Sequence, residues 1–395
     1  MVEPSFMLLF SVRLAARFEG FDGLPSGVSS SPPDQAGAYT SQFAEFETRL
    51  LGGTFVHARR LERWPLGRIA FDDLGDGAPP YADLYLLTHK SGMALWEVWL
   101  PAPSQSFDAT RWVEWLNPEA PDGLVARLWR VLGVVNRTIA GESTWAGLYF
   151  PLTLLRSPQQ PLEMVVEQHG EALVKLLFLD RSSRSLKSGL VADELGRDYC
   201  TREGGLTLLG RRSGLDVHGA EDLAEGLAPP GAPPKSAVPF IITIELLLLE
   251  RAVLEYLYER LSRNTPESVD DLLRLKQEIL DALEEYYGAI TNATRFSAAV
   301  TADGEQLLGL SDLYDAVMGR LETVSFSITT RYQRRMALSE FWLTVVFGAT
   351  EIGFIASNIA AWHYSTELVA VLAWTVGAAV ASALALVLAL RRRVQ

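Results

Sequence analysis

Two apolar runs near the carboxyl end constrain this 395-residue chain more than any other feature. The first runs from Phe341 to Trp362 and the second from Leu368 to Leu390, and only His363 to Glu367 separates them. At a rise of ~1.5 Å per residue, each run folded as a helix is long enough for the ~30 Å hydrocarbon core of a bilayer. The sequence therefore predicts a transmembrane hairpin at 341–390 that follows a soluble part.

Basic residues predict how this hairpin is oriented. They flank it on both outer sides, as Arg331, Arg334 and Arg335 before the first run and Arg391, Arg392 and Arg393 after the second, whereas the connecting turn has no Lys or Arg. Arg and Lys close to the ends of membrane spans tend to stay in the cytoplasm. We therefore expect a multi-pass protein of the cell inner (plasma) membrane, with both chain ends cytoplasmic and a basic tail at 391–395.

Composition removes several classes of function. The net charge of -13 argues against a nucleic-acid partner, because phosphate contacts need a basic surface. A single cysteine, Cys200, excludes an internal disulfide. The sequence has no glycine-rich phosphate loop, and its five histidines are scattered without metal-ligand spacing. We expect no enzyme, because no catalytic constellation is present.

The region 1–226 mixes short alternating apolar runs with amphipathic stretches, which predicts an α/β (α+β) cytoplasmic domain. A helix is predicted at 124–136, a loop at 24–41, and a hairpin turn at Lys90-Ser91-Gly92. The predicted strands are 6–18, 54–61, 84–88, 94–100, 144–155 and 173–179. Four tryptophans are expected in the core, although a ligand site lined by them stays an alternative: Trp96, Trp99, Trp112 and Trp115.

Beyond a proline-rich linker at 227–238, the pattern changes to long helices and a stalk over 239–340. Phe240 to Arg263 is expected to be a buried helix, and Thr265-Pro266 to start a second one. Ala302-Asp303-Gly304 is expected to break the second helix. The third carries a coiled-coil-like seam and is expected to run unbroken into the first span; its seam residues are Leu310, Tyr314, Val317, Leu321, Val324 and Ile328.

The first span carries a polar face. Thr344, Glu351 and Asn358 are seven residues apart, which places them on one side of a helix, with Gly348 and Ile355 between them. A carboxylate at mid-membrane costs ~2.5 to 3.5 kcal/mol on insertion scales and normally faces a protein interior or a water-filled path. Two helices cannot enclose such a path, so we expect several copies around an axis, with the second span outside.

In this arrangement Glu351 and Asn358 form rings of carboxylates and amides that bind metal cations. An alternative stays open for each residue. Glu351 is then a protonated carboxyl held by Thr375 or by a neighbouring helix, and Asn358 holds helices together by hydrogen bonds.

This order of elements resembles the CorA family of magnesium and divalent-cation transporters, best over Phe240 to Val394. Asp312-Leu313-Tyr314-Asp315, followed by Leu321-Glu322, is similar to a stretch of the family's stalk, and Arg391 to Arg393 are similar to its basic ring. The family's Gly-Met-Asn motif is absent, since the corresponding region reads Ser357-Asn358-Ile359.

The resemblance implies a homopentamer in a lipid bilayer, with the first span lining the pore. It places Glu340 and Arg391, Arg392 and Arg393 at the cytoplasmic pore entrance, and it implies a divalent cation, Mg²⁺ or similar, as the transported or regulatory ion. The alternative function is a membrane-anchored CorA-like sensor or effector without magnesium selectivity, gated by a ligand or partner that binds the soluble domain.

Overall fold

The structure is a computed structural model of mixed α/β class. It describes residues 2–14, 28–29, 39–48, 61–71, 79–89, 92–101, 107–120, 123–140, 145–223, 235–263, 270–271, 273–274, 277, 294–363 and 368–394. The chain divides into two compact units. The first comprises Met1–Asn264 and Lys276–Arg320, and the second comprises Thr265–Leu275 and Leu321–Gln395.

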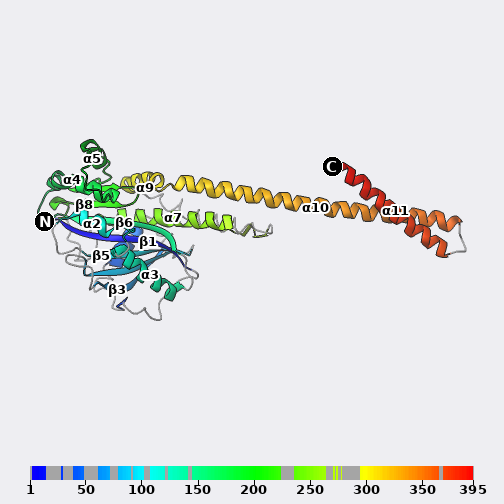
Figure 1. The fold of residues 1–395 in the computed structure, drawn as a ribbon, viewed down its shortest axis with the longest axis horizontal. Helices are drawn as coiled ribbons and strands as arrows, with labels where there is room; N and C mark the ends of the chain where they lie inside the picture. The colour runs from blue at the N-terminus through cyan, green and yellow to red at the C-terminus, as the bar shows by residue number, and fades with distance from the viewer. Residues whose placement is uncertain are drawn as a thin grey trace. The chain divides into compact units, whose positions relative to one another are not determined.

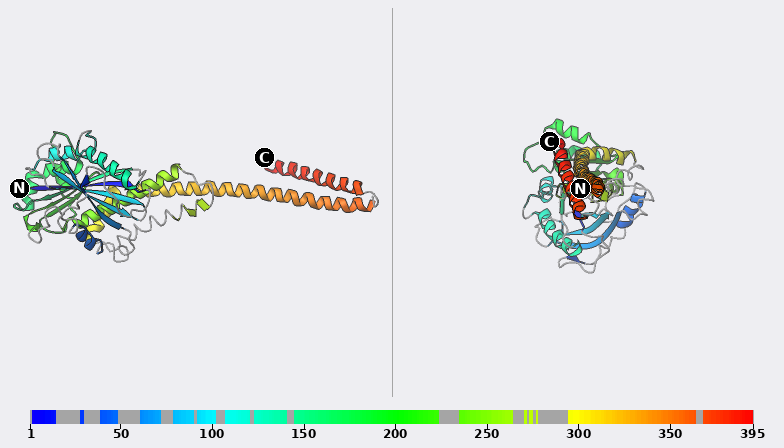
Figure 2. Two further views of the ribbon diagram at one scale, coloured as in Figure 1. Left: turned by 90° about the horizontal axis from the view of Figure 1, so that it is seen from below. Right: turned by 90° about the vertical axis from the view of Figure 1, so that its right-hand side faces the viewer.

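The first unit is built on an eight-stranded sheet with the order β2-β3-β4-β5-β1-β6-β8-β7 (Figure 1). Neighbouring strands are antiparallel except β6 and β8, which are parallel. The sheet has the twist usual for open sheets, so its strands fan out in Figure 2. The strands are β1 Glu3–Arg13, β2 Val28–Ser29, β3 Leu61–Ala70, β4 Tyr81–His89, β5 Met93–Leu100, β6 Trp145–Arg156, β7 Gly205–Leu209 and β8 Gly214–His218.

Helices cover both faces of this sheet, so the central strand β1 is buried on both sides. On one face, Phe6 meets Trp112 of α2 (Ala109–Trp115) and Phe10 meets Trp129 of α3 (Leu124–Ala140), both edge to face. α4 (Leu162–Phe178) packs against α2, β7 and β8, and α5 (Ser188–Leu195) packs on α4. α7 (Val238–Arg263) contacts β1, β5 and β6 from the opposite face.

Several predicted elements are confirmed. The strands predicted around 84–88, 94–100 and 144–155 are β4, β5 and β6, and the described part of 6–18 lies in β1 up to Arg13. Gly92 closes the predicted hairpin between β4 and β5 at a φ of 81°, which favours glycine. The predicted helix 124–136 lies within α3.

Two predictions fall mostly outside the described residues. Of the strand predicted at 54–61 only Leu61 is described, as the first residue of β3. Within the loop predicted at 24–41, residues 28–29 form β2 and residues 39–41 belong to a helical segment described over 39–48. The first unit also contains the four-residue helix α6, Ala220–Leu223.

The strand predicted at 173–179 is wrong, because this run is the last part of α4. Leu173, Val174, Leu176 and Leu177 are all buried, so both sides of this helix end are covered. A short apolar run of this kind has no helical period, and length alone does not separate it from a buried strand.

α7 confirms the predicted buried helix, since Phe240 to Glu250 lie in the interior. The predicted break at Ala302-Asp303-Gly304 is wrong, because these residues lie inside α9 (Arg295–Leu307). Gly304 serves packing instead, since a Cβ there would lie 2.5 Å from Cδ1 of Leu247 in α7. The chain turns at Gly309, whose φ of 65° is left-handed.

The helix α10 runs without a break from Leu310 to His363, which confirms that the third predicted helix continues into the first apolar run. Its seam residues Val317, Leu321, Val324 and Ile328 are buried. Of the second predicted helix, the described residues 270–271, 273–274 and 277 are helical.

In the second unit, α10 and α11 (Leu368–Val394) carry the apolar runs. Among the described residues, Ser339–Trp362 and Leu368–Val387 are long and apolar enough to cross a membrane, which indicates membrane association. The two runs pack against each other at Gly353, where a Cβ would lie 3.2 Å from Cβ of Ala379. Small residues at this contact let the two backbones approach closely.

Candidate functional site

The polar face of the first span lies away from α11. The buried residues of this span are Val345, Gly353 and Ala360, eight and seven positions apart, and they mark its packed side. Glu351 lies about half a turn from that side, because it is two residues from Gly353, ~200° of helix rotation, and nine from Ala360, ~900° or two and a half turns. The polar residues of the first span therefore lie opposite its packed side, among exposed apolar residues such as Phe347 and Phe354.

Four of the five residues predicted to line a pore share the uncovered side. Thr344, Glu351 and Asn358 are exposed, and Ile355 is 59% exposed. Gly348 lies at the edge of the packed side instead, since a Cβ on it would lie 2.9 Å from Cδ1 of Leu386 in α11. The predicted grouping is present for the four, and Gly348 belongs partly to the contact between the spans.

Within one chain, Thr375 does not satisfy the Glu351 carboxyl. The Thr375 hydroxyl donates to the carbonyl oxygen of Val371 at 2.7 Å, in its own helix. Thr344 does the same with the carbonyl of Glu340, at 2.8 Å. No hydrogen bond or ion pair to Glu351 is found among the described residues. Within the described part of one chain, no hydrogen bond joins Glu351 to Thr375.

The other predicted site residues form no cluster with Glu351. Glu340 is exposed at the start of the span, and Arg391, Arg392 and Arg393 are helical in α11, with side chains outside the described part of the chain. Glu351 and Asn358 are separated by a rise of ~10 Å, so one chain cannot bring both to a single ion. In the described ranges, no three acidic, histidine or cysteine side chains gather as a metal-binding group.

The first unit contains a buried charged cluster that the sequence does not reveal. Nη2 of Arg63 in β3 lies 2.6 Å from Oε2 of Glu245 in α7 and 3.2 Å from Oε1 of Glu47 in the helix 39–48. Nε of Arg63 lies 3.2 Å from Oε1 of Glu97 in β5. The Tyr39 hydroxyl donates to Oε2 of Glu97 at 2.9 Å. One cation thus joins four segments that are far apart in sequence.

Burial governs the electrostatics of this cluster. The side chains of Arg63, Glu97 and Glu245 are 4%, 0% and 1% exposed. Burial raises the pKa of Glu97 to about 7, although Arg63 and the Tyr39 hydrogen bond act to lower it. Burial also raises the pKa of Glu245 well above its ordinary value, against the effect of Arg63. The carboxylates therefore favour the charged form of Arg63, and burial favours the protonated form of Glu97 and Glu245.

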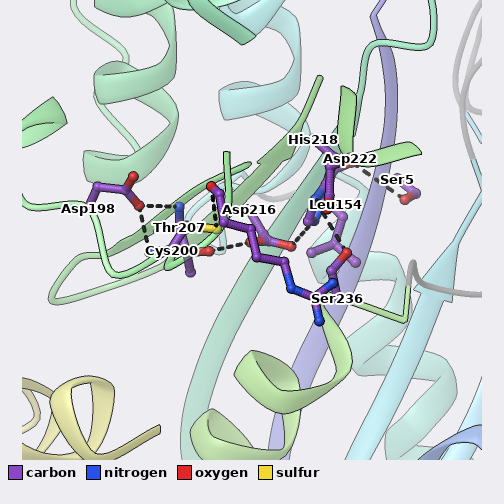
Figure 3. A network of polar contacts seen from close by, with 10 residues as sticks. Ser5, Leu154, Asp198, Cys200, Thr207, Asp216, His218, Asp222 and Ser236 are labelled. Carbon is purple, nitrogen blue, oxygen red and sulfur yellow. Dashed lines mark hydrogen bonds and ion pairs between the residues drawn. The ribbon is translucent and has the colours of Figure 1, made fainter. Parts of the chain in front are cut away.

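A second buried network surrounds His218 at the end of β8 (Figure 3). Its Nδ1 lies 2.6 Å from Oδ2 of Asp222, and its Nε2 lies 2.5 Å from Oδ2 of Asp216. The Thr207 hydroxyl donates to the other oxygen of Asp216 at 2.6 Å. Burial lowers the pKa of His218, but Asp216 and Asp222 outweigh it and raise the pKa to about 9. Because carboxylates occupy both ring nitrogens, the ring is a buried cation here and not a metal ligand.

The remaining chemical groups have structural surroundings. Trp96, Trp99 and Trp112 are fully buried and Trp115 packs against the core, which confirms their predicted place. Cys200 is half-buried, and its Sγ leaves room only for glycine at Gly205, where a Cβ would lie 2.5 Å away. Sequence reasoning missed both ionic networks, since each residue pattern is locally that of an ordinary amphipathic element.

Comparisons of the chain with protein-family models, with curated proteins and with solved structures found no match. The assignment of a function therefore depends on the geometry of the chain itself.

Proposed function

We propose that the chain is one subunit of an oligomeric membrane channel or transporter for metal cations, divalent ones such as Mg²⁺ first among them. The first span of each subunit lines the path. The observation that carries the proposal is the uncovered side of this span, where Thr344, Glu351 and Asn358 lie opposite the side packed on α11.

The physical argument starts from the cost of that side in hydrocarbon. A lipid-facing Glu costs ~2.5 to 3.5 kcal/mol even on the mildest scales, and the Asn358 amide adds unsatisfied donors. The second span is already used on the opposite side, so it cannot cover them. Symmetry-related copies can, if their first spans face a common axis and their second spans face the lipid.

Around such an axis the side chains acquire a function. Glu351 from each copy forms a ring of carboxylates that attracts cations, and Asn358 forms a ring of amide oxygens about two turns further along. Both are hard oxygen ligands, which suit Mg²⁺ and Ca²⁺. The resemblance to the CorA family favours five copies, with both chain ends in the cytoplasm and Glu340 and Arg391 to Arg393 near the inner entrance.

The test is Mg²⁺ flux into proteoliposomes that contain the full-length protein. Glu351→Ala and Asn358→Ala should each change the initial rate by tenfold or more, because each removes a whole ring. Thr350→Ala is the matched control, since the Thr350 hydroxyl donates within its own helix to Val346 at 2.7 Å and lies off the polar side. It should leave the rate within about twofold.

Two results would refute the proposal. One is a monomer in detergent by light scattering, because a single copy cannot enclose a path. The other is the absence of flux in the wild type and in all variants while the protein is folded and oligomeric. That second result favours the rival function, a membrane-anchored sensor that does not conduct.

A further inference from the structure

A large pocket in the first unit is lined by an unusual number of arginines. Its volume is about 1100 Å³, and five arginines contribute to its wall: Arg181, Arg197, Arg211, Arg212 and Arg251. Arg181 follows α4 and Arg197 follows α5. Arg211 and Arg212 form the β7–β8 turn, and Arg251 projects from α7. The chain as a whole has a net charge of -13, so this group of arginines is a local concentration of positive charge.

The pocket exists because β8 is shorter than β6. β6 pairs with β8 only from Leu152 onward. On the edge of β6 that faces β8, the residues before Leu152 therefore have no neighbouring strand among the described residues. In this part of β6, which pairs only with β1, Tyr149 lies with Trp129 of α3 on the face that carries Phe10, and these two rings form the aromatic wall of the pocket. The opening is thus flanked by an aromatic wall on one side and by the β7–β8 turn on the other.

Most of the arginine charge is not used within the chain. Arg197 pairs with Glu194 at 3.1 Å and Arg251 pairs with Glu255 at 3.0 Å. For Arg181, Arg211 and Arg212, the described part of the chain provides no ion pair. The wall also contains three acidic residues, Glu119, Asp303 and Asp312, so five arginines leave it with a formal charge of +2. The Asp303 carboxylate accepts a hydrogen bond from the Tyr199 hydroxyl at 2.6 Å.

The pocket wall also includes a buried side-chain amide. Asn117 lines the pocket and is 7% exposed, and its Nδ2 has no hydrogen-bond partner in the described residues. Its Oδ1 is occupied, because it accepts from the backbone N–H of Glu119 at 3.2 Å. A buried amide donor left without an acceptor is costly. The nitrogen itself is inaccessible to solvent, so a bound group reaches it only if the Asn117 side chain turns toward the pocket.

We propose that this pocket binds an organic polyphosphate, with its phosphates on the arginines and its ring system against the aromatic wall. Arginine forks match phosphate oxygens in charge and geometry, and charge-assisted hydrogen bonds of this kind are roughly twice as strong as neutral ones. Aromatic side chains stack on planar ring systems. The site is independent of the polar face in the first span, so it stands whether or not the protein conducts ions.

The pocket wall also includes Asp312, in the first turn of α10. The wall of this pocket thus includes a residue of the helix that continues into the first apolar run.

The test is isothermal titration of the full-length protein in detergent with ATP, AMP and inorganic pyrophosphate, each without added metal. ATP should bind more tightly than AMP, which has one phosphate, and more tightly than pyrophosphate, which has no ring. Arg211→Gln with Arg212→Gln should weaken ATP binding about tenfold or more. Both arginines are exposed in a turn, so this variant should melt at the wild-type temperature.

Arg184→Gln is the matched control, because Arg184 is an exposed arginine of the first unit outside the pocket wall. It should leave the ATP affinity within about twofold. The proposal is overturned if millimolar ATP shows no binding, or if the Arg211→Gln/Arg212→Gln variant binds ATP as the wild type does. It is also overturned if Arg184→Gln weakens binding equally, since the effect then reflects overall charge.

Discussion

Replacement of Arg63 by Met removes the cation of the buried cluster and leaves its carboxylates behind. Met retains most of the volume and the flexible stem, so the change is mainly electrostatic. In the wild type, the guanidinium contacts Glu47, Glu97 and Glu245 within 3.2 Å and lies 3.9 Å above the ring of Phe43. Burial alone would lower the pKa of Arg63, but the carboxylates raise it above its usual range, so the positive charge is present at every relevant pH.

The size of the expected loss of stability follows from the carboxylates that stay buried after the substitution. Removal of one partner from a buried ion pair costs ~3 to 5 kcal/mol, because the other charge stays buried and uncompensated. Here Glu97 and Glu245 are at most 1% exposed, so water cannot replace the guanidinium without opening the core. For a unit of this size, such a loss lowers the melting temperature on the order of 10 °C.

The loss should depend on pH in a defined direction. A carboxyl whose folded pKa is raised stabilises the protein less as pH rises from its ordinary pKa through the folded one. For Glu97 that window runs from 4.5 to about 7. In Arg63→Met the folded pKa rises further, since the attraction that lowers it is gone. The deficit against wild type should therefore be largest at pH 8 and smaller at pH 5.5, where the carboxyls are protonated.

The assay is thermal unfolding of the full-length protein in detergent, followed by tryptophan fluorescence from the buried Trp96, Trp99 and Trp112. Arg184→Met, at an exposed position, is the control and should stay within ~0.5 kcal/mol of wild type. A fall of less than 2 °C at pH 8, or an equal fall at both pH values, would show that the cluster is not the buried ionic centre described here.

Two further predictions concern other buried ionisable groups. The pKa of His218 in the folded protein is about 9, against an ordinary 6.5. Protonated His218 therefore contributes about 3 kcal/mol to the free energy of unfolding below pH 6.5, and this contribution is lost as pH rises through 9. The difference in melting temperature between wild type and His218→Gln should shrink from pH 6 to pH 9.5, and a constant difference would contradict this. Burial, and to a smaller extent Glu305, raises the pKa of Glu250 to about 7. Glu250→Gln should therefore raise the melting temperature by a few degrees at pH 8 and leave it unchanged at pH 5. Equal shifts at both pH values would refute the raised pKa of Glu250.

Local patterns gave sound predictions wherever one segment carries the whole signal. The hairpin at Gly92, the buried helix at Phe240 to Arg263 and the continuous α10 each follow from hydropathy period or turn chemistry within a few dozen residues. Local patterns failed where contacts with another segment determine which residue is present. Leu173, Val174, Leu176 and Leu177 are apolar because α4 is covered on two sides. Gly304 is glycine because Leu247 of α7 passes close by.

The candidate site divides in the same way. The spacing of Thr344, Glu351 and Asn358 by itself determined that they share a helix face, because an α-helix repeats closely over seven residues. Only tertiary packing decided that this face is the uncovered one and that Gly348 borders α11.

Two apolar helices at the carboxyl end and an α/β unit before them could be predicted from the sequence, since length, hydropathy and periodicity are properties of each segment. The tertiary structure alone decided that Arg63 meets carboxylates from three distant segments, that His218 lies between two aspartates, and that five arginines surround one pocket. The physical reason is that electrostatic partners act through space, and the sheet order that sets those distances depends on all strands together.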